Sequence, residues 1–592
     1  MTGYTAPLAD MRFVLEHVVD LPALSGLAGF EHAEPEMVYG VLEESGRFFS
    51  QEFAPLNRVG DVQHSRRNDD GTVTTPEGFV QAYRRYVEAG WGGVQFPADY
   101  GGGGFPWLVG TALQEMLTAA NIGFGLCPML TQGAIEMLLH YGSEEQREVY
   151  LPRMVSGEWT GTMNLTESQA GSDLGALTTR AVPADDGTWR VTGQKIFITY
   201  GEHDLAENIV HLVLARVPDA PPGTKGISCF IVPKFLVDDD GSIGDRNAVE
   251  CVSIEQKMGI NASPTCVMAY DGAVGYLIGE ANEGMRYMFK MMNNARLSVG
   301  VSGLALGERT YQQAVEYARE RRQGRAPGAP AGDSSPIVEH PDVRRMLMTM
   351  RAHIEALRCL AYLNAESIDL AQHHPDEAVR TARSELTDLL TPITKAWGTD
   401  VGVELTSLAL QVHGGMGYIE ETGVAQHYRD IRIAPVYEGT NGIQAIDLVG
   451  RKLPMRAGGV VADHLAAIEA TAGELSAADV PLASIGKHLA DAHATLKATT
   501  DWLLANAPAD PTNALAGATP YLRMCGIVTG GWLLARSART AQRMLDAGEG
   551  DADFLTQKLV TAKFYAEQIL PQAAGLAPSV TAGPADLQAA EF

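Results

Sequence analysis

The feature that most constrains the fold of this chain is a change of sequence period near residue 161 and a change back near residue 281. Up to about residue 158, apolar residues recur with helical spacing. From Gly161 to Gly279 they form short strand-like runs, separated by Gly, Pro, Asn and Asp. From Gly284 the helical spacing returns. Strands without intervening helices favour an antiparallel barrel or sandwich, so the sequence predicts an α+β protein whose strands lie in the middle.

Local signals place several helices. Pro35-Glu36-Met37 predicts a helix through Phe53, and Thr75-Pro76-Glu77 predicts a second helix start. Ser143 to Gln146 resembles a capping box. The uncharged run from Met116 to Ile135 has the length of a membrane span, but it contains polar residues, a proline and glycines. We therefore expect two buried helix pieces with a break between them, and no membrane segment.

Turn residues divide the rest of the chain. Strands are expected at 188–193, 195–199, 209–217, 226–232, 251–256 and 265–270. Long helices are expected at 284–322 and 341–372, with a flexible loop at 324–332 between them. The Ala-rich end is helical with a break at 507–511. The predicted domains are 1–160 (helical), 161–280 (β), 281–455 (helical bundle) and 456–592 (an additional helical module).

Charge and cysteine content limit the function. The formal net charge of −27 argues against a chain that binds nucleic acid or anionic membranes. Six cysteines lie far apart without a CxxC pair, which indicates buried reduced thiols and gives no reason to expect a metal site. The N-terminus has no basic region followed by an apolar stretch. A cytoplasmic location is therefore expected.

Three segments carry more polar and glycine residues than folding alone requires. Thr162 to Asp173 concentrates hydroxyls and small residues where the period changes, as a polar ligand close to the backbone would need. Gly193 to Gly201 could provide an aromatic wall for a flat ring. In Gln411 to Tyr418, two adjacent glycines follow a helix and would let a phosphate approach. Each segment also has a purely structural interpretation: a capped turn, a core strand and a helix end, respectively.

The fourth segment, Tyr437 to Gln444, contains a carboxylate, Glu438, directly before a glycine in a short loop between apolar residues and a predicted helix. If the loop is buried, the carboxylate loses water and its pKa rises, which suits a general base. A lone loop glutamate is otherwise an ordinary surface residue, so the other segments have to decide the interpretation.

Six segments together resemble the acyl-CoA dehydrogenase family. They are LTESQAGSD (165–173), GQKIFITYG (193–201), NNARLSVG (293–300), YARERRQGR (317–325), QVHGGMGYIEE (411–421) and YEGTNGIQ (437–444). Their order and spacing match the family over about residues 35–455. The N-terminal YTAPLADMRFVL, the insertion after Gly324 and the C-terminal module resemble a longer subgroup that includes 3-methylmercaptopropionyl-CoA dehydrogenases.

The resemblance implies that the chain binds FAD and forms an α,β double bond in an acyl-CoA thioester, giving the trans-2-enoyl-CoA. Glu438 falls on the position of the base that removes the α-proton. The flavin would contact Met163, Leu165, Thr166, Gly171, Ser172, Phe197, Ile198, Thr199, Gln411, Gly414, Gly415, Thr440 and Gly442, with Arg321, Gln323 and His340 reaching the FAD of a neighbouring subunit. The substrate would contact Ser172, Asn293, Asn294, Arg296 and Gly439.

The resemblance also implies a role in fatty-acid β-oxidation, with electron-transfer flavoprotein as acceptor. FAD shared between subunits implies at least a dimer, and a C-terminal module over the face that shorter members use for tetramers favours a homodimer. Some members carry the base one residue before the arginine of NNAR, but here that residue is Ala295, which cannot act as a base.

Two alternatives stay open from the sequence. An acyl-CoA oxidase shares the chemistry and differs in how the reduced flavin meets oxygen. A nucleic-acid-associated flavoprotein of the alkylation-response type would need a basic C-terminal domain, whereas residues 455–592 hold 9 Lys and Arg against 14 Asp and Glu. Departures from the family pattern are Ser168 for a frequent Pro, Phe197 for a frequent Trp, Gly324 for a frequent Phe and Asn293 for a common Asp.

Overall fold

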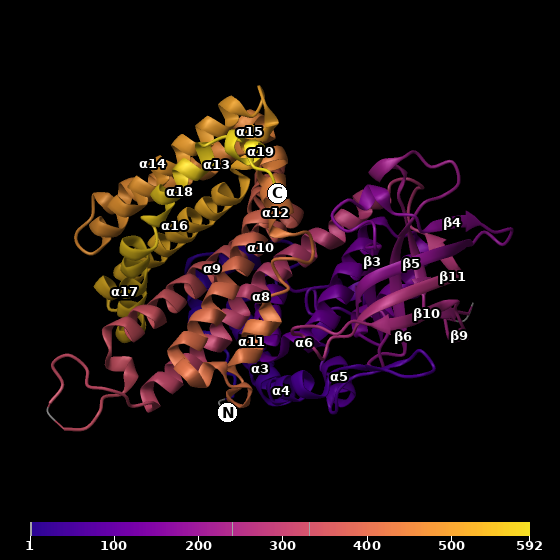
Figure 1. Ribbon diagram of the computed structural model, residues 1–592, viewed down its shortest axis with the longest axis horizontal. Coiled ribbons are helices and arrows are strands. Elements are labelled where there is room, and N and C mark those ends of the chain that lie inside the picture. Colours follow the sequence, from indigo (N-terminus) through magenta and orange to yellow (C-terminus); the bar gives the residue numbers. More distant parts are fainter. Residues whose placement is uncertain (1–2, 239–240, 331) are drawn as a thin grey trace. The chain divides into compact units, whose positions relative to one another are not determined.

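The computed structural model describes residues 3–238, 241–330 and 332–592 (Figure 1). The chain forms two compact units. The helical unit comprises the N-terminal residues up to Glu43, Pro106–Glu115 and Val299–Phe592, and the sheet unit comprises Glu44–Phe105 and Met116–Ser298. Both units are assembled from segments far apart in the chain. The four consecutive domains expected from the sequence stay a prediction, and Ala331 of the expected flexible loop lies outside the described residues.

The elements before the sheet are mainly helices. They are α1 (Leu8–His17), α2 (Leu21–Ser25), α3 (Pro35–Glu52), α4 (Ala54–Gln63), α5 (Phe79–Glu88), α6 (Trp107–Tyr141) and α7 (Glu144–Ser156), with short strands β1 (Arg66–Arg67) and β2 (Val73–Thr74). The predicted capping box is confirmed, because the Ser143 hydroxyl accepts from the Gln146 amide and the Gln146 side chain accepts from the Ser143 amide, both at 3.1 Å.

The predicted break in the uncharged run is also confirmed. Asn121 leaves the helical conformation inside α6, with φ −160° and ψ 93°. Its side chain accepts from the Phe124 amide and donates to the Phe53 carbonyl, so the break is capped. This helix is long and apolar enough to cross a membrane, but 89% of its most apolar window is buried within the fold, as in a core helix.

The helix start predicted at Thr75 is wrong. The helix α5 begins at Phe79, after Gly78 in the left-handed conformation. The hydroxyl and amide of Thr75 both donate to the Asp204 carboxylate, at 2.7 and 3.1 Å. A partner 129 residues away in sequence therefore takes the role that helix capping would have given to this threonine.

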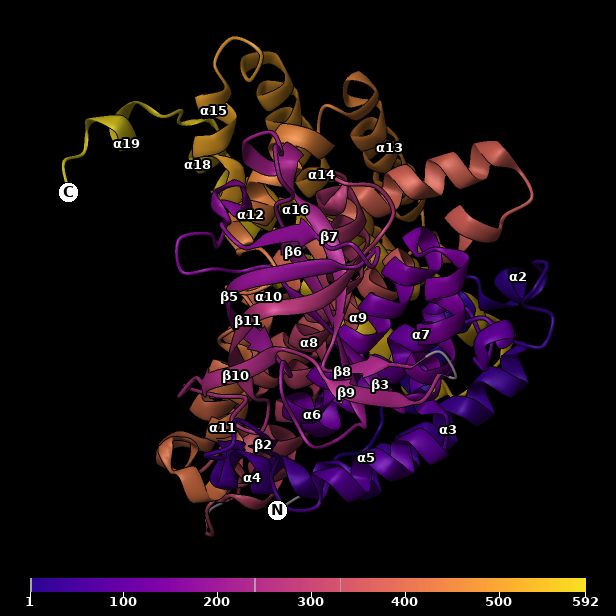
Figure 2. The ribbon, with the colours of Figure 1, turned by 90° about the vertical axis from the view of Figure 1, so that its right-hand side faces the viewer.

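A seven-stranded sheet forms the core of the sheet unit (Figure 2). Its strands and the small hairpin beside it are β3 (Trp159–Asn164), β4 (Arg180–Pro183), β5 (Trp189–Thr199), β6 (Asn208–Ala215), β7 (Ser228–Pro233), β8 (Phe235–Val237), β9 (Ile243–Arg246), β10 (Val249–Ile254) and β11 (Thr265–Leu277). The strand order is β3-β6-β7-β11-β5-β4, with β10 beside β11. The long strand β11 pairs with β5, β10 and β7 in turn, which lets the sheet bend around its core.

One pair in this sheet differs from the antiparallel expectation. Strands β3 and β6 are parallel over six residue pairs, whereas the other pairs are antiparallel. Both strands are buried along their whole length, as parallel strands require. The parallel pair places the end of β3, where the first predicted flavin segment begins, beside β6, with Asn164 opposite Val213.

The remaining elements are helices. They are α8 (Gly284–Glu320), α9 (Pro341–His373), α10 (Glu377–His413), α11 (Val424–Ile431), α12 (Asn441–Asp447), α13 (Gly459–Ser476), α14 (Leu482–Asn506), α15 (Pro511–Ala516), α16 (Ala518–Ala547), α17 (Ala552–Gln568), α18 (Gln572–Thr581) and α19 (Ala585–Ala589). We call α13–α19 the C-terminal module. All six cysteines are buried and free, as predicted.

Helices α8 and α10 approach one another closely because glycines line their crossing. A Cβ atom on Gly303 would lie 2.0 Å from the Gly398 carbonyl oxygen, and one on Gly300 would lie 2.6 Å from the Thr394 carbonyl oxygen. Side chains at these positions would force the helices apart. The helix that leads to the segment 411–421 is thus fixed against its neighbour by backbone contact.

This packing predicts opposite effects for two Gly→Ala changes. We expect Gly303→Ala to lower the melting temperature, since overpacking costs about 1–3 kcal/mol. In the exposed interior of α13, Gly473 has nothing within 4 Å of its Cβ position, and Gly473→Ala should raise the melting temperature by improving helix propensity. Differential scanning calorimetry measures both. Equal melting temperatures for the two variants would contradict the close helix crossing.

Candidate active site

The first predicted flavin segment follows strand β3 in the sheet unit. Met163 and Leu165 are each 8% exposed, Thr166 is half-buried, and Gly171 and Ser172 are exposed. A Cβ atom on Gly171 would meet nothing within 4 Å, so the backbone there is open to a ligand. The structure brings these five residues into one loop.

A buried ion pair fastens this loop to strand β5. The Lys195 ammonium lies 2.8 Å from the Glu167 carboxylate, and the two side chains are 0% and 4% exposed. Lys195 also donates to the Leu165 carbonyl at 2.9 Å. The Glu167 carboxylate accepts from the amides of Thr178 and Thr179 at 2.7 and 3.0 Å. A single carboxylate therefore holds both ends of the segment 165–179.

The environment of Glu167 favours its charged form. Burial by itself would raise the pKa of this carboxyl, but the charge of Lys195 and the hydrogen bonds from Lys195, Thr179 and Thr178 outweigh burial and hold the pKa well below its ordinary value of 4.5. The pair is ionised at neutral pH, and its hydrogen bonds are satisfied.

Phe197 lies at a bulge in strand β5. Met268 and Cys266 of β11 pair with Lys195 and Ile198, so two residues of β5, Ile196 and Phe197, lie opposite one residue of β11. Phe197 has a φ of +60°, and its side chain is 59% exposed. A bulge turns a side chain out of the alternation of a strand, and here it presents an aromatic ring on the surface of the sheet unit.

The neighbours of Phe197 are placed differently. The Ile198 side chain is 2% exposed and packs in the core of the sheet, so the structure does not bring it to the exposed face of Phe197. Thr199 is half-buried, and its carbonyl accepts from the Thr162 hydroxyl at 2.7 Å.

The segment 293–296 lies on α8 in the sheet unit. Arg296 is 5% exposed. Its guanidinium donates to the Asn293 side chain at 3.1 Å and lies 5.8 Å from the centre of the Phe289 ring. The side-chain oxygen of Asn294 is buried and has no hydrogen-bond partner. A buried acceptor without a donor is a position where a ligand would supply one.

In the helical unit, Arg321, Gln323 and His340 come together in one loop. The Gln323 amide donates to the Ser335 carbonyl at 3.0 Å, and the Ile337 amide donates to the Arg321 carbonyl at 2.8 Å. The His340 ring lies 2.8 Å from the Gln323 carbonyl. The side chains of Arg321 and Gln323 are exposed.

Gln411, Gly414 and Gly415 lie at the end of α10. All three are exposed, and a Cβ atom on either glycine would meet nothing within 4 Å. Gly414 has φ +60° and ψ −139°, which a residue with a side chain rarely adopts. The backbone at this helix end is therefore open.

Glu438 lies in a tight loop of the helical unit. Glu438 and Gly439 have φ values of +57° and +79°. The Asn441 amide donates to the Pro435 carbonyl at 2.9 Å and closes the loop, and the Thr440 hydroxyl caps α12 by accepting from the Ile443 amide at 3.1 Å. Glu438 is half-buried. The left-handed backbone conformation costs a glutamate about 1–3 kcal/mol, so this loop has backbone strain at Glu438.

Four family models match consecutive parts of the chain. They describe an acyl-CoA dehydrogenase N-terminal domain (residues 42–158), middle domain (162–273) and C-terminal domain (282–453), and an acetyl-CoA dehydrogenase C-terminal-like domain (464–591). The chain is 50% identical over 568 residues to 3-methylmercaptopropionyl-CoA dehydrogenase of Ruegeria pomeroyi, covering 96% of each chain. The chain belongs to the acyl-CoA dehydrogenase family.

Two further comparisons agree with this membership. Butyryl-CoA dehydrogenase of Syntrophomonas wolfei is 33% identical, with 97% of this chain and 96% of that protein covered. The crystal structure of an acyl-CoA dehydrogenase complexed with FAD from Bacillus anthracis has the same fold, with a TM-score of 0.76, 20% identity, and coverage of 94% and 89%. The family, the fold class and the assignment as a dehydrogenase predicted from the sequence are confirmed, whereas the FAD of the Bacillus anthracis structure is a property of that protein.

The residues present fit the flavin that this family carries. The sheet unit offers an exposed aromatic ring at Phe197 and an open backbone at Gly171. The helical unit offers an open backbone at Gly414 and Gly415. In the sheet unit, an exposed aromatic ring suits packing against a flat ring system. In the helical unit, a helix-end backbone without side chains suits the approach of a phosphate.

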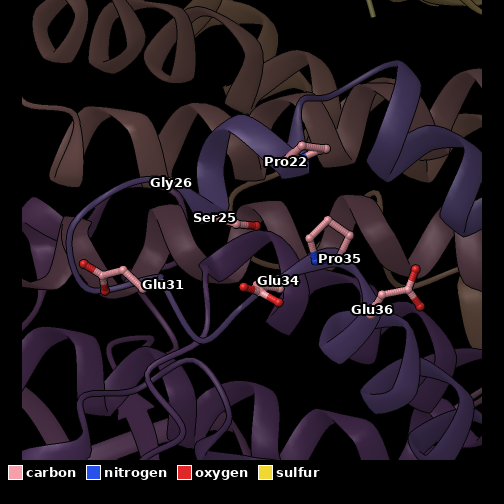
Figure 3. A pocket seen from close by; sticks show the side chains of 7 residues that line it. All are labelled: Pro22, Ser25, Gly26, Glu31, Glu34, Pro35 and Glu36. Atoms are coloured by element: carbon pink, nitrogen blue, oxygen red, sulfur yellow. The ribbon is translucent and has the colours of Figure 1, made fainter.

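A shallow surface pocket of about 580 Å³ lies elsewhere in the helical unit, beside α2 (Figure 3). It is lined by Pro22, Ser25, Gly26, Glu31, Glu34, Pro35 and Glu36. The Ser25 hydroxyl already lies 2.8 and 2.7 Å from the carbonyls of Leu21 and Ala33. Three carboxylates and an occupied hydroxyl do not suit an acyl-CoA, whose phosphates are anionic.

Sequence reasoning missed the residues that support the predicted site. Glu167 and Lys195 lie inside two of the matched segments but were not singled out, although a lysine within the apolar strand 195–199 is a recognisable signal. Asn441 follows the predicted base by three residues and was also missed. The resemblance to the family assigns no role to these three side chains. Each of them supports the predicted site through the residues that it binds.

The ion pair predicts a pH-dependent loss of stability. Glu167→Gln leaves the Lys195 ammonium buried without a counter-charge, which costs about 3–5 kcal/mol, so we expect a lower melting temperature than that of the wild type at pH 7. The contribution of Glu167 is complete above its ordinary pKa of 4.5 and is lost as the pH falls below that value. The difference between the two proteins should therefore shrink from pH 5 downward.

Asp186→Asn is the control, because Asp186 pairs with Arg190 on the surface of the same unit. Its melting temperature should stay close to that of the wild type. A difference between Glu167→Gln and wild type that is constant from pH 7 to pH 3 would contradict the assignment of a stabilising buried carboxylate.

Proposed function

We propose that the chain oxidises an acyl-CoA thioester between its α and β carbons, produces the trans-2-enoyl-CoA and passes the electrons to electron-transfer flavoprotein. The observation that carries the proposal is the strained loop of Glu438. Strain at a charged residue persists only where the surrounding structure enforces it, and such strain is typical of residues with a chemical task.

In this proposal Glu438 accepts the α-proton of the thioester. That proton is weakly acidic, so the negative charge that develops on the thioester oxygen has to be stabilised. A backbone amide beside the base can do this. The left-handed conformations of Glu438 and Gly439 turn the peptide groups on either side of the base out of the helical or strand alignment, an arrangement that can direct a backbone amide toward an anionic ligand.

FAD, when bound, would supply the acceptor for the β-hydrogen and its electron pair. The residues of the chain would hold and orient the reactants: Phe197 would pack on the flat ring, Gly414 and Gly415 would admit the pyrophosphate, and Asn294 and Arg296 would face the CoA part. The substrate of the Ruegeria relative supports 3-methylmercaptopropionyl-CoA as the first thioester to test. We extend the proposal to a role in β-oxidation, a cytoplasmic location and a homodimer, with Arg321, Gln323 and His340 serving the FAD of the other subunit.

Replacing the base should separate chemistry from binding. We expect Glu438→Gln to keep FAD and to lose about 10²–10⁴-fold or more in turnover, since glutamine preserves the shape and cannot accept a proton. Turnover is measured with a panel of acyl-CoA thioesters and a ferrocenium acceptor, and FAD content by absorbance.

Glu421→Gln, at an exposed glutamate of the same unit, is the matched control and should keep full turnover. If Glu438→Gln retained wild-type turnover, Glu438 would not be the base. Peroxide formation under air at the rate of turnover would instead indicate an oxidase.

A further inference from the structure

Trp397 of α10 packs against helix α16 of the C-terminal module at a notch formed by Gly526 and Gly530. Its side chain is 1% exposed. A Cβ atom on Gly526 would lie 2.3 Å from Cγ of this indole, and one on Gly530 would lie 2.7 Å from its Cη2 atom. The two glycines therefore let the ring lie directly against the backbone of α16. Figure 1 shows α16 and α10 side by side, and the two helices are in contact.

Helix α16 is itself fixed. The Arg523 guanidinium donates to both carboxylate oxygens of Glu404 on α10, at 2.6 and 3.1 Å. Within the module, the Tyr565 hydroxyl donates to the Ile527 carbonyl at 2.9 Å, and the His464 ring lies 3.0 Å from the Thr529 hydroxyl. These contacts hold α16 against α10 and against the rest of the module. The notch on α16 therefore determines the position of Trp397.

The residues that flank Trp397 hold the loop of Glu438. The side-chain oxygen of Asn441 accepts from the Lys395 ammonium at 2.8 Å. The side-chain nitrogen of Asn441 donates to the Ala396 carbonyl at 3.1 Å and to the Asp400 carboxylate at 2.7 Å. The Thr399 hydroxyl accepts from the same nitrogen at 3.0 Å. All four α10 partners of this asparagine therefore lie within three residues of Trp397.

Asn441 in turn determines the shape of the loop. Its amide donates to the Pro435 carbonyl at 2.9 Å, so the segment 435–441 is closed at its base on α10. Glu438 lies in the middle of that segment, in the left-handed region. A short path of direct contacts therefore runs from α16 through Trp397, the backbone and side chains of 395–400, and Asn441 to the strained glutamate.

We propose that the C-terminal module is a positioning element for the base: the glycine notch of α16 seats Trp397, and Trp397 keeps the α10 residues that anchor Asn441 in register with the loop of Glu438. This inference rests on the proposed function of Glu438. Trp397, Gly526 and Asn441 are positioning residues, because none of them needs to touch the substrate. A displacement of about 1 Å at a reacting group can cost about 10²-fold in rate.

The test compares two glycines of α16 that differ in what they face. Gly526→Ala forces a methyl group against Trp397. Gly531→Ala is matched, because its Cβ would lie 2.5 Å from Leu570, inside the module and away from Trp397. We expect both variants to lose similar thermal stability and to retain FAD.

The two variants should differ in chemistry. For Gly526→Ala we expect the rate of anaerobic flavin bleaching by a saturating acyl-CoA to fall about 10–100-fold, with KM changed less than about threefold. For Gly531→Ala the bleaching rate should stay within about threefold of wild type. A merely structural role would lower stability in both variants and leave the rate per FAD-containing molecule unchanged.

A second pair of variants decides the question if Gly526→Ala does not fold. Asn441→Ala removes the anchor, whereas Asn364→Ala removes a fully buried asparagine of α9 that contacts the hydroxyls of Thr391 and Thr394 on the same helix α10. Asn441→Ala should slow bleaching about 10-fold or more at unchanged KM, and Asn364→Ala should not.

Equal bleaching rates within each pair of variants would overturn the inference while leaving the proposed function intact. If the wild type bound FAD but bleached with none of the thioesters, the proposed function would fail, and the inference with it. The wild-type measurement therefore distinguishes the two failures before any variant is compared.

Discussion

A glutamate in the left-handed region has to be held there, and much of the helical unit can be understood from that requirement. The conformation of Glu438 is unfavourable by itself, so the loop 435–441 needs fixed ends. Asn441 provides them through hydrogen bonds to four residues of α10. Helix α10 is fixed on one side by the glycine crossing with α8 and on another by the seat of Trp397 on α16. Closely packed helices on two sides can hold a strained loop in place.

The sheet unit also contains a site loop that has to be held in place, and a different interaction holds it. Its predicted flavin segment is a loop without regular structure, and a buried carboxylate rather than a helix contact fixes it. The Glu167 carboxylate accepts hydrogen bonds from the Lys195 ammonium and from two backbone amides. The loop is therefore held by charge-assisted hydrogen bonds in a buried environment. Such a network is costly to break because any one missing partner leaves a buried group unsatisfied.

The sequence predicted what local patterns determine. The capping box at Ser143, the break at Asn121 and the return of helices after residue 284 depend on residues within a few positions of each other, and all three are present. The helix start at Thr75 failed because a carboxylate 129 residues away binds the threonine. The parallel pairing of β3 with β6 and the bulge at Phe197 depend on neighbouring strands, whose direction and register no local pattern contains. For the site, motifs identified Glu438, whereas Asn441 and Lys195 needed tertiary contacts to be recognised.

Hydrogen–deuterium exchange at the α-carbon of a thioester measures whether Glu438 removes the α-proton. A thioester with sulfur in place of its β-carbon can lose its α-proton but has no β-hydride to give. Incubated in D₂O with the FAD-containing protein, it should take up deuterium at the α-carbon, as followed by NMR. If Glu438 is the base, we expect exchange with the wild type and none above background with Glu438→Gln. Exchange at the same rate with both proteins would contradict it.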